Sequence, residues 1–443
     1  MILDSEWLLD RLAALTAGDK ATRWLVAFSG GIDSTVLLHA LCRAAERDPG
    51  KIIAIHINHG LHPDAAAWAE HCRRITDELG ITLISSQVRI DENSGGGPEA
   101  AAREARYAVL QTEARRGDCV LSAHHEDDQA ETLLLNLMRG SGLAGLAGIG
   151  AVQGFGRGRL LRPLLGMPGD AIEAYADRHK LVWIDDPSNE DLRFDRNFLR
   201  REIVPRLAAR WPAVAARLSQ SADLAGEASG LLRDLADIDI AAAGSAKRLD
   251  IGALLSLGTA RQRNLLRRAV SLCGLPPPPA TRLYQAVHEL IPARKDAQPL
   301  VAWQGAELRR YRDHLHVMPT LSDSPGEPAQ LLRPDMSLDL GPGMGHLLLS
   351  PAANGGIDPR LATAGLQVRY RRGGEAIRPA GHEITHKLKK LLQQEGIVPW
   401  MRERLPLLYA GDKLVAVAEL WIAGECSHPD GYGVTWSNRL ALN

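Results

Sequence analysis

In the first half of the chain, short apolar runs alternate with longer amphipathic segments. Four of the runs have the length of β-strands, and each is followed by a segment with the apolar spacing of a helix. This alternation is typical of βαβ units, whose right-handed crossovers build a doubly wound parallel sheet of the α/β class. Ligands bind such sheets at the carboxyl ends of the strands. The four expected strands cover residues 24–28, 52–58, 81–90 and 119–123.

Composition and charge narrow the class of protein. A length of 443 residues suggests two to four domains, and 45% hydrophobic residues are ample for packed cores. The net charge of −1 means that contact with nucleic acid would depend on local basic clusters. The N-terminal segment carries Asp4, Glu6 and Asp10 and lacks the basic region of a signal peptide. We therefore expect a soluble, cytoplasmic protein without a membrane span.

A Gly-rich loop lies between the first expected strand and a helix-like run at residues 35–41. Its small residues let backbone N–H groups approach an anion, and the N-terminus of the following helix adds donors and a favourable dipole. The chain has no Gly-Lys-Ser or Gly-Lys-Thr, so the lysine of a Walker A motif is missing. The pattern predicts a phosphate site without kinase-like chemistry, formed by Ser29, Gly30, Gly31, Ile32, Asp33 and Ser34.

The densest group of polar residues, at 122–132, follows the fourth expected strand and runs into a helix. It holds two histidines and four carboxylates within eight residues, which is more than helix capping requires, although Asp127 or Asp128 can serve as a cap. Asp127 and Glu131 are four positions apart and therefore share one helix face. Together with His124 they suit binding of Mg²⁺ or of a cationic substrate, and proton transfer. Asp127 is the candidate Mg²⁺ ligand.

A further expected helix, at residues 99–107, carries Arg103 and Arg106 on one face. Two arginines can hold an anion, but such pairs are also common as solvated surface charge. The spacing alone does not separate these two interpretations.

Several motifs together resemble the tRNA(Ile)-lysidine synthetases, whose Gly-rich loop is the PP-loop of the N-type ATP pyrophosphatases. The motifs are Ser-Gly-Gly-Ile-Asp-Ser at 29–34, His-Gly-Leu at 59–61, Ala-Arg-Glu-Ala-Arg-Tyr at 102–107 and His-His-Glu-Asp-Asp-Gln-Ala-Glu-Thr at 124–132. The match continues through Asp-Pro-Ser-Asn at 186–189 to about residue 210. The C-terminal region resembles the last domain of the longer family members at 368–375, 387–392 and 399–407.

The resemblance implies ligation of L-lysine to C2 of the wobble cytidine in a tRNA(Ile) with a CAU anticodon. ATP would adenylate the cytidine with Mg²⁺ present, and the lysine ε-amine would then displace AMP. Arg103 and Arg106 would stabilise phosphate charge, His124 would assist proton transfer, and Asp127 and Glu131 would accept the lysine ammonium or Mg²⁺. The expected catalytic residues are Asp33, Arg103, Arg106, His124, Asp127 and Glu131.

The resemblance also implies three domains. We expect a PP-loop catalytic domain at 1–215, a mostly helical middle domain that contacts tRNA at 216–325, and a small α+β tRNA-binding domain at 366–443. Residues 326–365 lie between them in a region rich in Pro, Gly and Asp, which suits a linker or short strands.

A tRNA is much larger than the catalytic domain, so we expect basic groups on more than one domain to contact it. One cluster lies at 193–206 and the other at 369–390, although interspersed acidic residues also allow each to be a solvated face. The candidate tRNA-binding residues are Arg196, Arg200, Arg371, Lys387, Lys389 and Lys390.

Two alternatives remain at the level of the sequence. A tRNA thiolase would act on similar RNA, but the five cysteines are far apart and form no CxxC pair. A non-catalytic, ATP-sensing RNA-binding protein would keep the PP-loop alone, whereas this chain also has the cluster from Asp127 to Glu131. The oligomeric state, a homodimer included, is left open.

Overall fold

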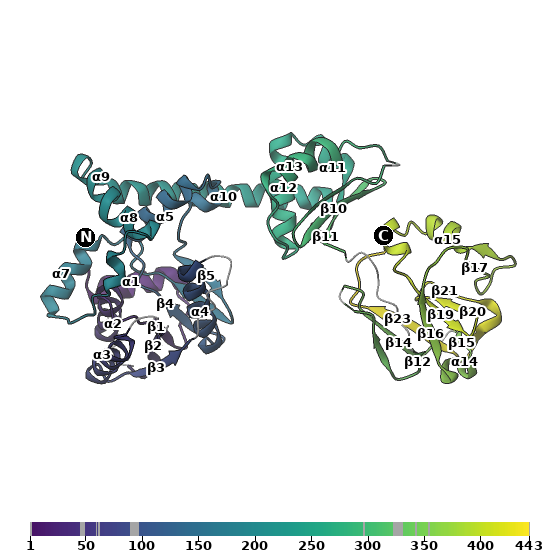
Figure 1. Ribbon diagram of the computed structural model, residues 1–443, viewed down its shortest axis with the longest axis horizontal. Coiled ribbons are helices and arrows are strands. Elements are labelled where there is room, and N and C mark those ends of the chain that lie inside the picture. Colours follow the sequence, from purple (N-terminus) through teal and green to yellow (C-terminus); the bar gives the residue numbers. More distant parts are fainter. Residues whose placement is uncertain are drawn as a thin grey trace. The chain divides into compact units, whose positions relative to one another are not determined.

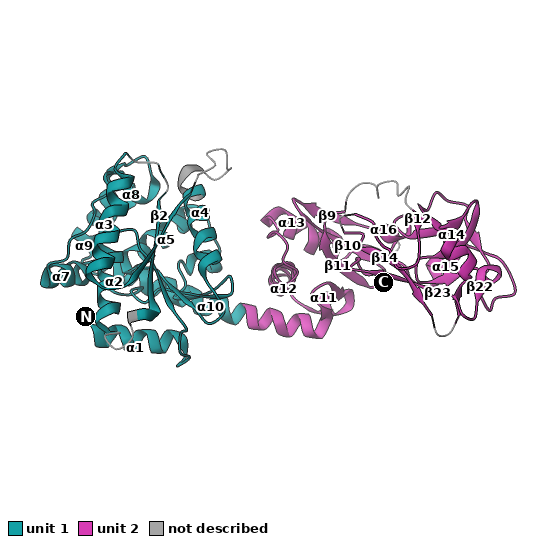
Figure 2. Ribbon diagram, turned by 90° about the horizontal axis from the view of Figure 1, so that it is seen from below, with its two compact units in different colours: residues 1–232 teal, residues 233–443 magenta. Residues whose placement is uncertain are grey.

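The computed structural model describes residues 2–44, 49–58, 60, 63–88, 97–295, 297–321, 331–341, 343–352 and 355–442. Contacts divide the chain into two compact units, residues 1–232 and 233–443, and helix α10 (Val214–Ala243) passes from one to the other (Figure 2). His59 and Leu61 of the His-Gly-Leu motif lie outside the described residues. Among the residues described, no helix has both the length and the apolar character needed to cross a membrane.

The first unit is built on a mainly parallel sheet (Figure 1). Within the described part of the chain the strand order is β3-β2-β1-β4-β6-β5, and β5 is antiparallel to β6. The pairs β1–β2, β1–β4, β2–β3 and β4–β6 are all parallel. The strands are β1 (Trp24–Ala27), β2 (Ile52–Asn58), β3 (Thr82–Gln87), β4 (Cys119–Leu121), β5 (Val152–Phe155) and β6 (Gly158–Leu161).

Helices cover both faces of this sheet, which confirms the expected doubly wound α/β fold. Alternate residues of a strand face opposite sides. Leu25 of β1 packs in one apolar cluster with Leu110 of α4, whereas Val26 packs in another with Leu37 of α2. The helices of the unit are α1 (Ser5–Thr16), α2 (Ile32–Ala44), α3 (Ala65–Glu78), α4 (Gly97–Glu113), α5 (Glu126–Met138), α6 (Leu143–Leu146), α7 (Gly169–His179), α8 (Asp195–Phe198), the π-helix η3 (Leu199–Ile203) and α9 (Val204–Arg210).

The middle region of the chain contains helices, as expected, together with an antiparallel sheet that the sequence pattern did not predict. The helical elements are α11 (Ile251–Ser256), α12 (Thr259–Leu272), α13 (Ala280–Gln285) and the π-helix η4 (Ala286–Leu290). These helices and the sheet share one apolar core, and the residues of this core include Leu265, Leu308 and Leu315. Its described strands, in the order β7-β8-β11-β10-β9, are β7 (Gly244–Ser245), β8 (Arg248–Asp250), β9 (Leu300–Trp303), β10 (Ala306–Tyr311) and β11 (His314–Pro319).

The C-terminal part of the second unit packs antiparallel strands and short helices around one core, which confirms its expected α+β class. One described sheet has the order β12-β16-β19-β20-β21 and another the order β13-β14-β23-β15-β22. The elements are β12 (Leu331–Leu332), β13 (Ser337–Asp339), β14 (His346–Pro351), β15 (Gly356–Ile357), α14 (Pro359–Ala364), β16 (Leu366–Tyr370), β17 (Ala376–Ile377), β18 (His386–Lys387), α15 (Leu388–Gln394), α16 (Pro399–Arg402), β19 (Pro406–Ala410), β20 (Lys413–Val417), β21 (Trp421–Ile422), β22 (Ser427–His428) and β23 (Tyr432–Ser437).

Candidate active site

The Gly-rich loop connects β1 to α2 and is braced by its own polar atoms. Gly30 has a φ of 87°, a left-handed conformation that favours glycine, and a Cβ at this position would lie 2.6 Å from Ile184 Cδ1. Ser34 Oγ donates to Gly31 O at 3.0 Å and lies 3.1 Å from Ser29 Oγ. The loop is therefore a fixed turn at the carboxyl end of β1, next to the N-terminus of α2, which is a favourable place for a phosphate.

The polar cluster of the sequence lies at the end of the neighbouring strand β4 and starts α5. Asp128 accepts a hydrogen bond from the His125 backbone N–H at 3.0 Å, so the capping interpretation holds for this carboxylate. Gln129 lies elsewhere on the helix and binds the backbone of Ala147 and Ile149. The polar side chains of α5 therefore face different neighbours. Gln129 faces the backbone of Ala147 and Ile149, whereas the carboxylates lie toward the PP-loop side.

Two arginines from α8 and η3 pair with the buried carboxylates of α5. Glu131 has only 1% of its side chain exposed, and it accepts from Arg196 Nε at 2.7 Å and from Arg200 Nε at 2.6 Å. Both guanidiniums also contact Asp128 Oδ1 at 3.1 Å. Burial lowers the pKa of Arg200, but the hydrogen bond to Glu131 and the charges of the nearby carboxylates together raise it by more, so the pKa lies above its usual value. The four side chains form a closed charge network, which we call the Arg–carboxylate clasp.

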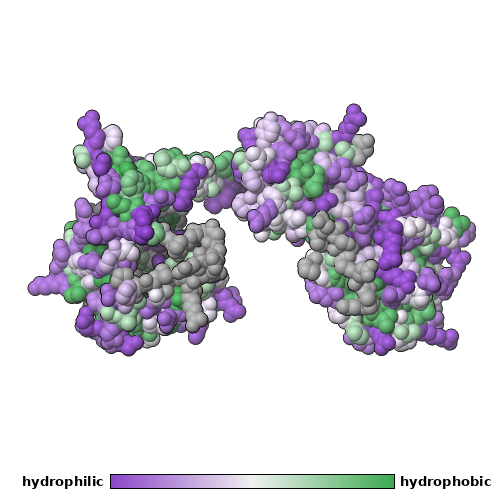
Figure 3. Space-filling view, in the orientation of Figure 1, coloured by the Kyte–Doolittle hydropathy of each residue, from purple (hydrophilic) through white to green (hydrophobic). Residues whose placement is uncertain are grey.

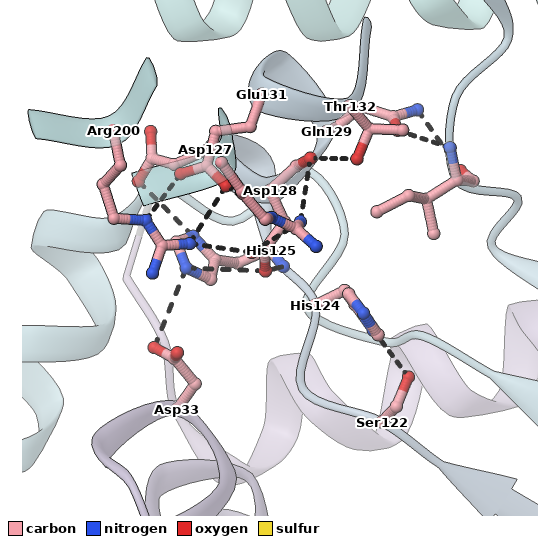
Figure 4. Close-up of polar contacts among 12 residues, drawn as sticks. Asp33, Ser122, His124, His125, Asp127, Asp128, Gln129, Glu131, Thr132 and Arg200 are labelled. Atoms are coloured by element: carbon pink, nitrogen blue, oxygen red, sulfur yellow. Dashed lines mark hydrogen bonds and ion pairs between the residues drawn. The ribbon is translucent and has the colours of Figure 1, made fainter. Parts of the chain in front are cut away.

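His125 lies at the centre of three carboxylates (Figure 4). Its Nε2 is 3.8 Å from Asp33 Oδ1 and 3.7 Å from Asp128 Oδ2, and its Nδ1 is 3.4 Å from Asp127 Oδ2. Burial alone would lower the pKa of His125, but the three carboxylates outweigh it and raise this pKa to about 9. The imidazole is therefore a cation at neutral pH. It links the PP-loop residue Asp33 to the start of α5.

His124 faces a different direction from its neighbour. Figure 4 shows its ring turned toward Ser122, and its Nδ1 lies 3.0 Å from Ser122 Oγ. Burial lowers the pKa of His124 to about 4, so this ring is neutral at pH 7 and accepts rather than supplies a proton. The role in proton transfer expected for His124 remains a prediction.

Asp33 and Asp127 are accessible carboxylates beside His125, with 40% and 37% of their side chains exposed. Burial raises the pKa of Asp33 in spite of the opposing charge of His125. Over the residues that the structure describes, no three His, Cys, Asp or Glu side chains converge to hold a metal ion. This donor set fits Mg²⁺, which is commonly held by one or two carboxylates together with water and substrate phosphates.

Arg103 and Arg106 project from α4 and are both exposed. The Arg103 guanidinium donates to Tyr107 Oη at 2.9 Å and lies 4.9 Å from the centre of that ring. Its positive charge is one of those that lower the pKa of His124, which places Arg103 on the His124 side of the site. The assignment of both arginines to phosphate charge remains a prediction.

Sequence reasoning missed the central position of His125 and the clasp. Arg196 and Arg200 were expected on an RNA-facing surface, and the structure places both guanidiniums on Asp128 and Glu131. Their spacing of four residues was a signal for a shared partner, but it does not say which partner. Glu131, expected to receive a lysine ammonium, already has two guanidiniums on its carboxylate.

Comparisons with known proteins cover nearly the whole chain. Family models match three segments: "PP-loop domain" at residues 5–207, "TilS substrate binding domain" at 249–316 and "TilS substrate C-terminal domain" at 366–436. The tRNA(Ile)-lysidine synthase of Alkalilimnicola ehrlichii is 44% identical over 97% of this chain and 96% of that protein. The chain belongs to the tRNA(Ile)-lysidine synthase family. The family member of Coxiella burnetii is 39% identical over 98% of this chain and 96% of that protein.

This membership in the lysidine synthase family confirms the resemblance based on the motifs. The segment matched by the family's C-terminal model contains the second basic cluster. Lys387, Lys389 and Lys390 are exposed at the start of α15. Arg371 differs from them, because 15% of its side chain is exposed and its Nε lies 3.4 Å from Glu375 Oε2. Glu375 also accepts from the N–H groups of Arg372 and Gly373, so this ion pair helps to fold the turn.

Proposed function

We propose that this protein ligates L-lysine to C2 of the wobble cytidine of tRNA(Ile) with a CAU anticodon. ATP is converted to AMP and pyrophosphate, and the lysidine formed changes codon reading from AUG to AUA. The observation that carries this proposal is the near full-length relation to tRNA(Ile)-lysidine synthases. The PP-loop and the cluster of His125, Asp33 and Asp127 at adjacent strand ends support it.

The first step is adenylation of the cytidine. The C2 carbonyl oxygen attacks the α-phosphorus of ATP, and the bond to the β-phosphate breaks to release pyrophosphate. The N–H groups of the PP-loop and the N-terminus of α2 hold the phosphates. Asp33 and Asp127 would hold Mg²⁺, which when bound offsets phosphate charge. Arg103 and Arg106 supply further positive charge from α4.

The second step is attack by lysine. The neutral ε-amine adds to C2 of the adenylated cytidine, the C2–O bond breaks, and AMP leaves with the oxygen. The amine must first lose a proton, and a carboxylate near the ammonium can orient it. Of the two carboxylates expected from the sequence, Asp127 is accessible whereas Glu131 is buried in the clasp, so Asp127 rather than Glu131 would orient the ammonium where Asp33 alone holds Mg²⁺. Glu131 then acts indirectly, by fixing α8 and η3 against α5.

Surfaces on both units suit an RNA partner. On the first unit, apolar side chains gather over α8 and the adjoining part of α10 (Figure 3). Phe198 of α8 is 44% exposed. Exposed aromatic rings stack on unpaired bases, and the exposed Arg206 and Arg210 of α9 lie on the same segment of chain. On the second unit, Lys387, Lys389 and Lys390 provide exposed charge for phosphates.

The test measures pyrophosphate release from ATP with L-lysine and unmodified tRNA(Ile) bearing a CAU anticodon. Separate controls omit lysine or tRNA, and the nucleosides of the product RNA are weighed by mass spectrometry. We expect release that depends on tRNA, together with a cytidine derivative that carries the mass of lysine. ATP binding without turnover would favour an ATP-sensing RNA-binding protein. Turnover without the lysine adduct would indicate another acceptor chemistry.

A further inference from the structure

The N-termini of α5 and α7 meet beside the active-site cluster. The Glu126 backbone N–H, at the start of α5, donates to Met167 O at 3.0 Å, and Met167 is fully buried. Pro168 and Gly169 follow directly and begin α7. A Cβ built on Gly169 would lie 2.5 Å from Asp127 Oδ2 and 3.6 Å from His125 Cε1. Carbon atoms do not approach a carboxylate oxygen to 2.5 Å, so the present place of Asp127 depends on the missing side chain.

We propose that Gly169 is a positioning residue for the reaction, because its lack of a side chain lets the Asp127 carboxylate lie against α7 and face His125. The proposal rests on the proposed function in one respect, namely that Asp127 takes part in the reaction. Its structural content, a steric link between residue 169 and the carboxylate of residue 127, stands on the geometry alone.

The backbone at this position gives no other reason for glycine. Gly169 is the first residue of an eleven-residue helix and does not have the positive φ that residues such as Gly166 have. Glycine weakens helices relative to alanine, so a glycine here is unfavourable for α7 itself. The atom that an alanine would meet is the far end of a side chain and can move by rotation. The fold can therefore accept Gly169→Ala, but the carboxylate of Asp127 has to leave its place.

The steric contact with Asp127 and the helical backbone at residue 169 together predict a Gly169→Ala variant that folds normally but reacts slowly. Gly169→Ala should fold with an unchanged or slightly raised Tm, because alanine favours the helix. Its kcat should fall by about 10- to 100-fold, since a misplacement of about 1 Å in an active site has effects of this size. The KM values for ATP and tRNA should stay within about twofold, because the PP-loop and the basic surfaces are not touched.

A double-mutant cycle tests the link. Gly169→Ala, Asp127→Ala and the double variant are compared in the full-length protein for kcat, both KM values and Tm. In the Asp127→Ala background the carboxylate that would clash with the added Cβ is absent. Gly169→Ala should therefore lower kcat by less than about twofold in that background. The control for activity is Gly258→Ala, at the N-cap of α12, where an added Cβ meets no atom within 4 Å, so kcat and both KM values should stay at the wild-type level.

A second readout does not depend on the reaction. The NMR signal of the His125 Cε1–H, assigned with a His125→Asn variant, should shift in Gly169→Ala. Because the added Cβ also lies 3.6 Å from His125 Cε1, a smaller direct shift is expected when Gly169→Ala is added to Asp127→Ala, and the difference between the two shifts reports the displaced carboxylate. Full activity and an unchanged signal in Gly169→Ala would overturn the proposal, as would a loss that is additive with Asp127→Ala or a clear fall in Tm. If neither the wild type nor any variant forms lysidine, the proposed function fails. The NMR comparison still tests the steric link between residue 169 and the Asp127 carboxylate.

Discussion

The basic residues of the two units differ in what their charges do, although the sequence predicts the same role for both groups. In the catalytic unit, Arg196 and Arg200 are engaged by Asp128 and the buried Glu131. In the C-terminal region, Lys389 and Lys390 are exposed at the start of α15 and have no ion pair among the described residues. A guanidinium that is paired with a buried carboxylate acts on structure first, whereas an exposed, unpaired ammonium is available to a phosphate.

A cluster of arginines on a helix is therefore not by itself an RNA surface. Arg196 and Arg200 lie four positions apart and so point the same way, toward two carboxylates of α5 that are themselves three apart. Their common direction makes the clasp. Lys389 and Lys390 are adjacent and lie between the buried Leu388 and Leu391, so their side chains stay on the solvent side of a helix whose other face is core.

Removing the charge of Glu131 should have the largest effect. Glu131→Gln keeps the shape of the side chain but leaves two guanidiniums facing a single carboxylate, Asp128. We expect a loss of about 2–3 kcal/mol in the free energy of unfolding, reduced from the fully buried case because Arg200 is partly exposed. Lysidine formation should fall at least 100-fold. Urea unfolding and the pyrophosphate assay measure the two effects.

The control for this variant is Glu202→Gln, which removes the partner of Arg206 in an exposed pair on the same segment. We expect at most about 1 kcal/mol from it and near-normal activity, since surface ion pairs contribute little. Equal stability of Glu131→Gln and the wild type would contradict the structural role of the clasp.

Charge reversal on α15 should act on tRNA alone. The double variant Lys389→Glu and Lys390→Glu should raise the KM for tRNA by roughly tenfold and leave kcat and the KM for ATP unchanged. The dependence of binding on salt should also weaken, by about one unit of slope for each lost phosphate contact. The measurement is a titration of tRNA at several salt concentrations.

Lys295→Glu is the charge control in the same unit, because Lys295 is exposed and is already paired with Asp313. It should change the KM for tRNA by less than twofold. An unchanged tRNA affinity in the α15 double variant would remove Lys389 and Lys390 from the tRNA surface.

The fold of the catalytic unit and the place of its site were predictable because they rest on local patterns. Alternating strands and helices fix the parallel sheet, and Gly30 and Ser34 mark the turn at the end of β1. The antiparallel sheet β7-β8-β11-β10-β9 was not predictable from the pattern. Its short hairpins lie on either side of the helices α11 to α13, and the pairing of β8 with β11 that joins them is non-local.

The details of the site depend on long-range contacts that no local pattern contains. His124 and His125 are adjacent in sequence, but only the packed structure shows which ring meets Asp33, a residue more than ninety positions away. The same holds for Glu131 and Arg200, and for the approach of Gly169 to Asp127. Local spacing named the right residue types and the right strand ends, whereas the division of roles among them followed from burial and charge.

The smallest effect is expected at an exposed ion pair of the second unit, between Asp237 of α10 and Arg268 of α12. The guanidinium donates to both carboxylate oxygens, at 2.7 and 2.8 Å, and these hydrogen bonds lower the pKa of Asp237. Because the folded pKa lies below the unfolded one, the pair stabilises the protein above the unfolded pKa of about 3.9. The stabilisation is lost as the pH falls through the folded pKa.

Asp237→Asn should therefore lower Tm slightly and by a constant amount between pH 7 and pH 5, and the gap to the wild type should close below about pH 4. Asp223→Asn, an exposed carboxylate on the same helix, is the control and should show no such closing gap. A gap that stays constant down to pH 3 would mean that the carboxylate contributes through packing rather than charge. Together with the Glu131 variant, this result separates a buried Arg–carboxylate network, which should be needed for both stability and activity, from an exposed pair, which should shift stability only where Asp237 is ionised.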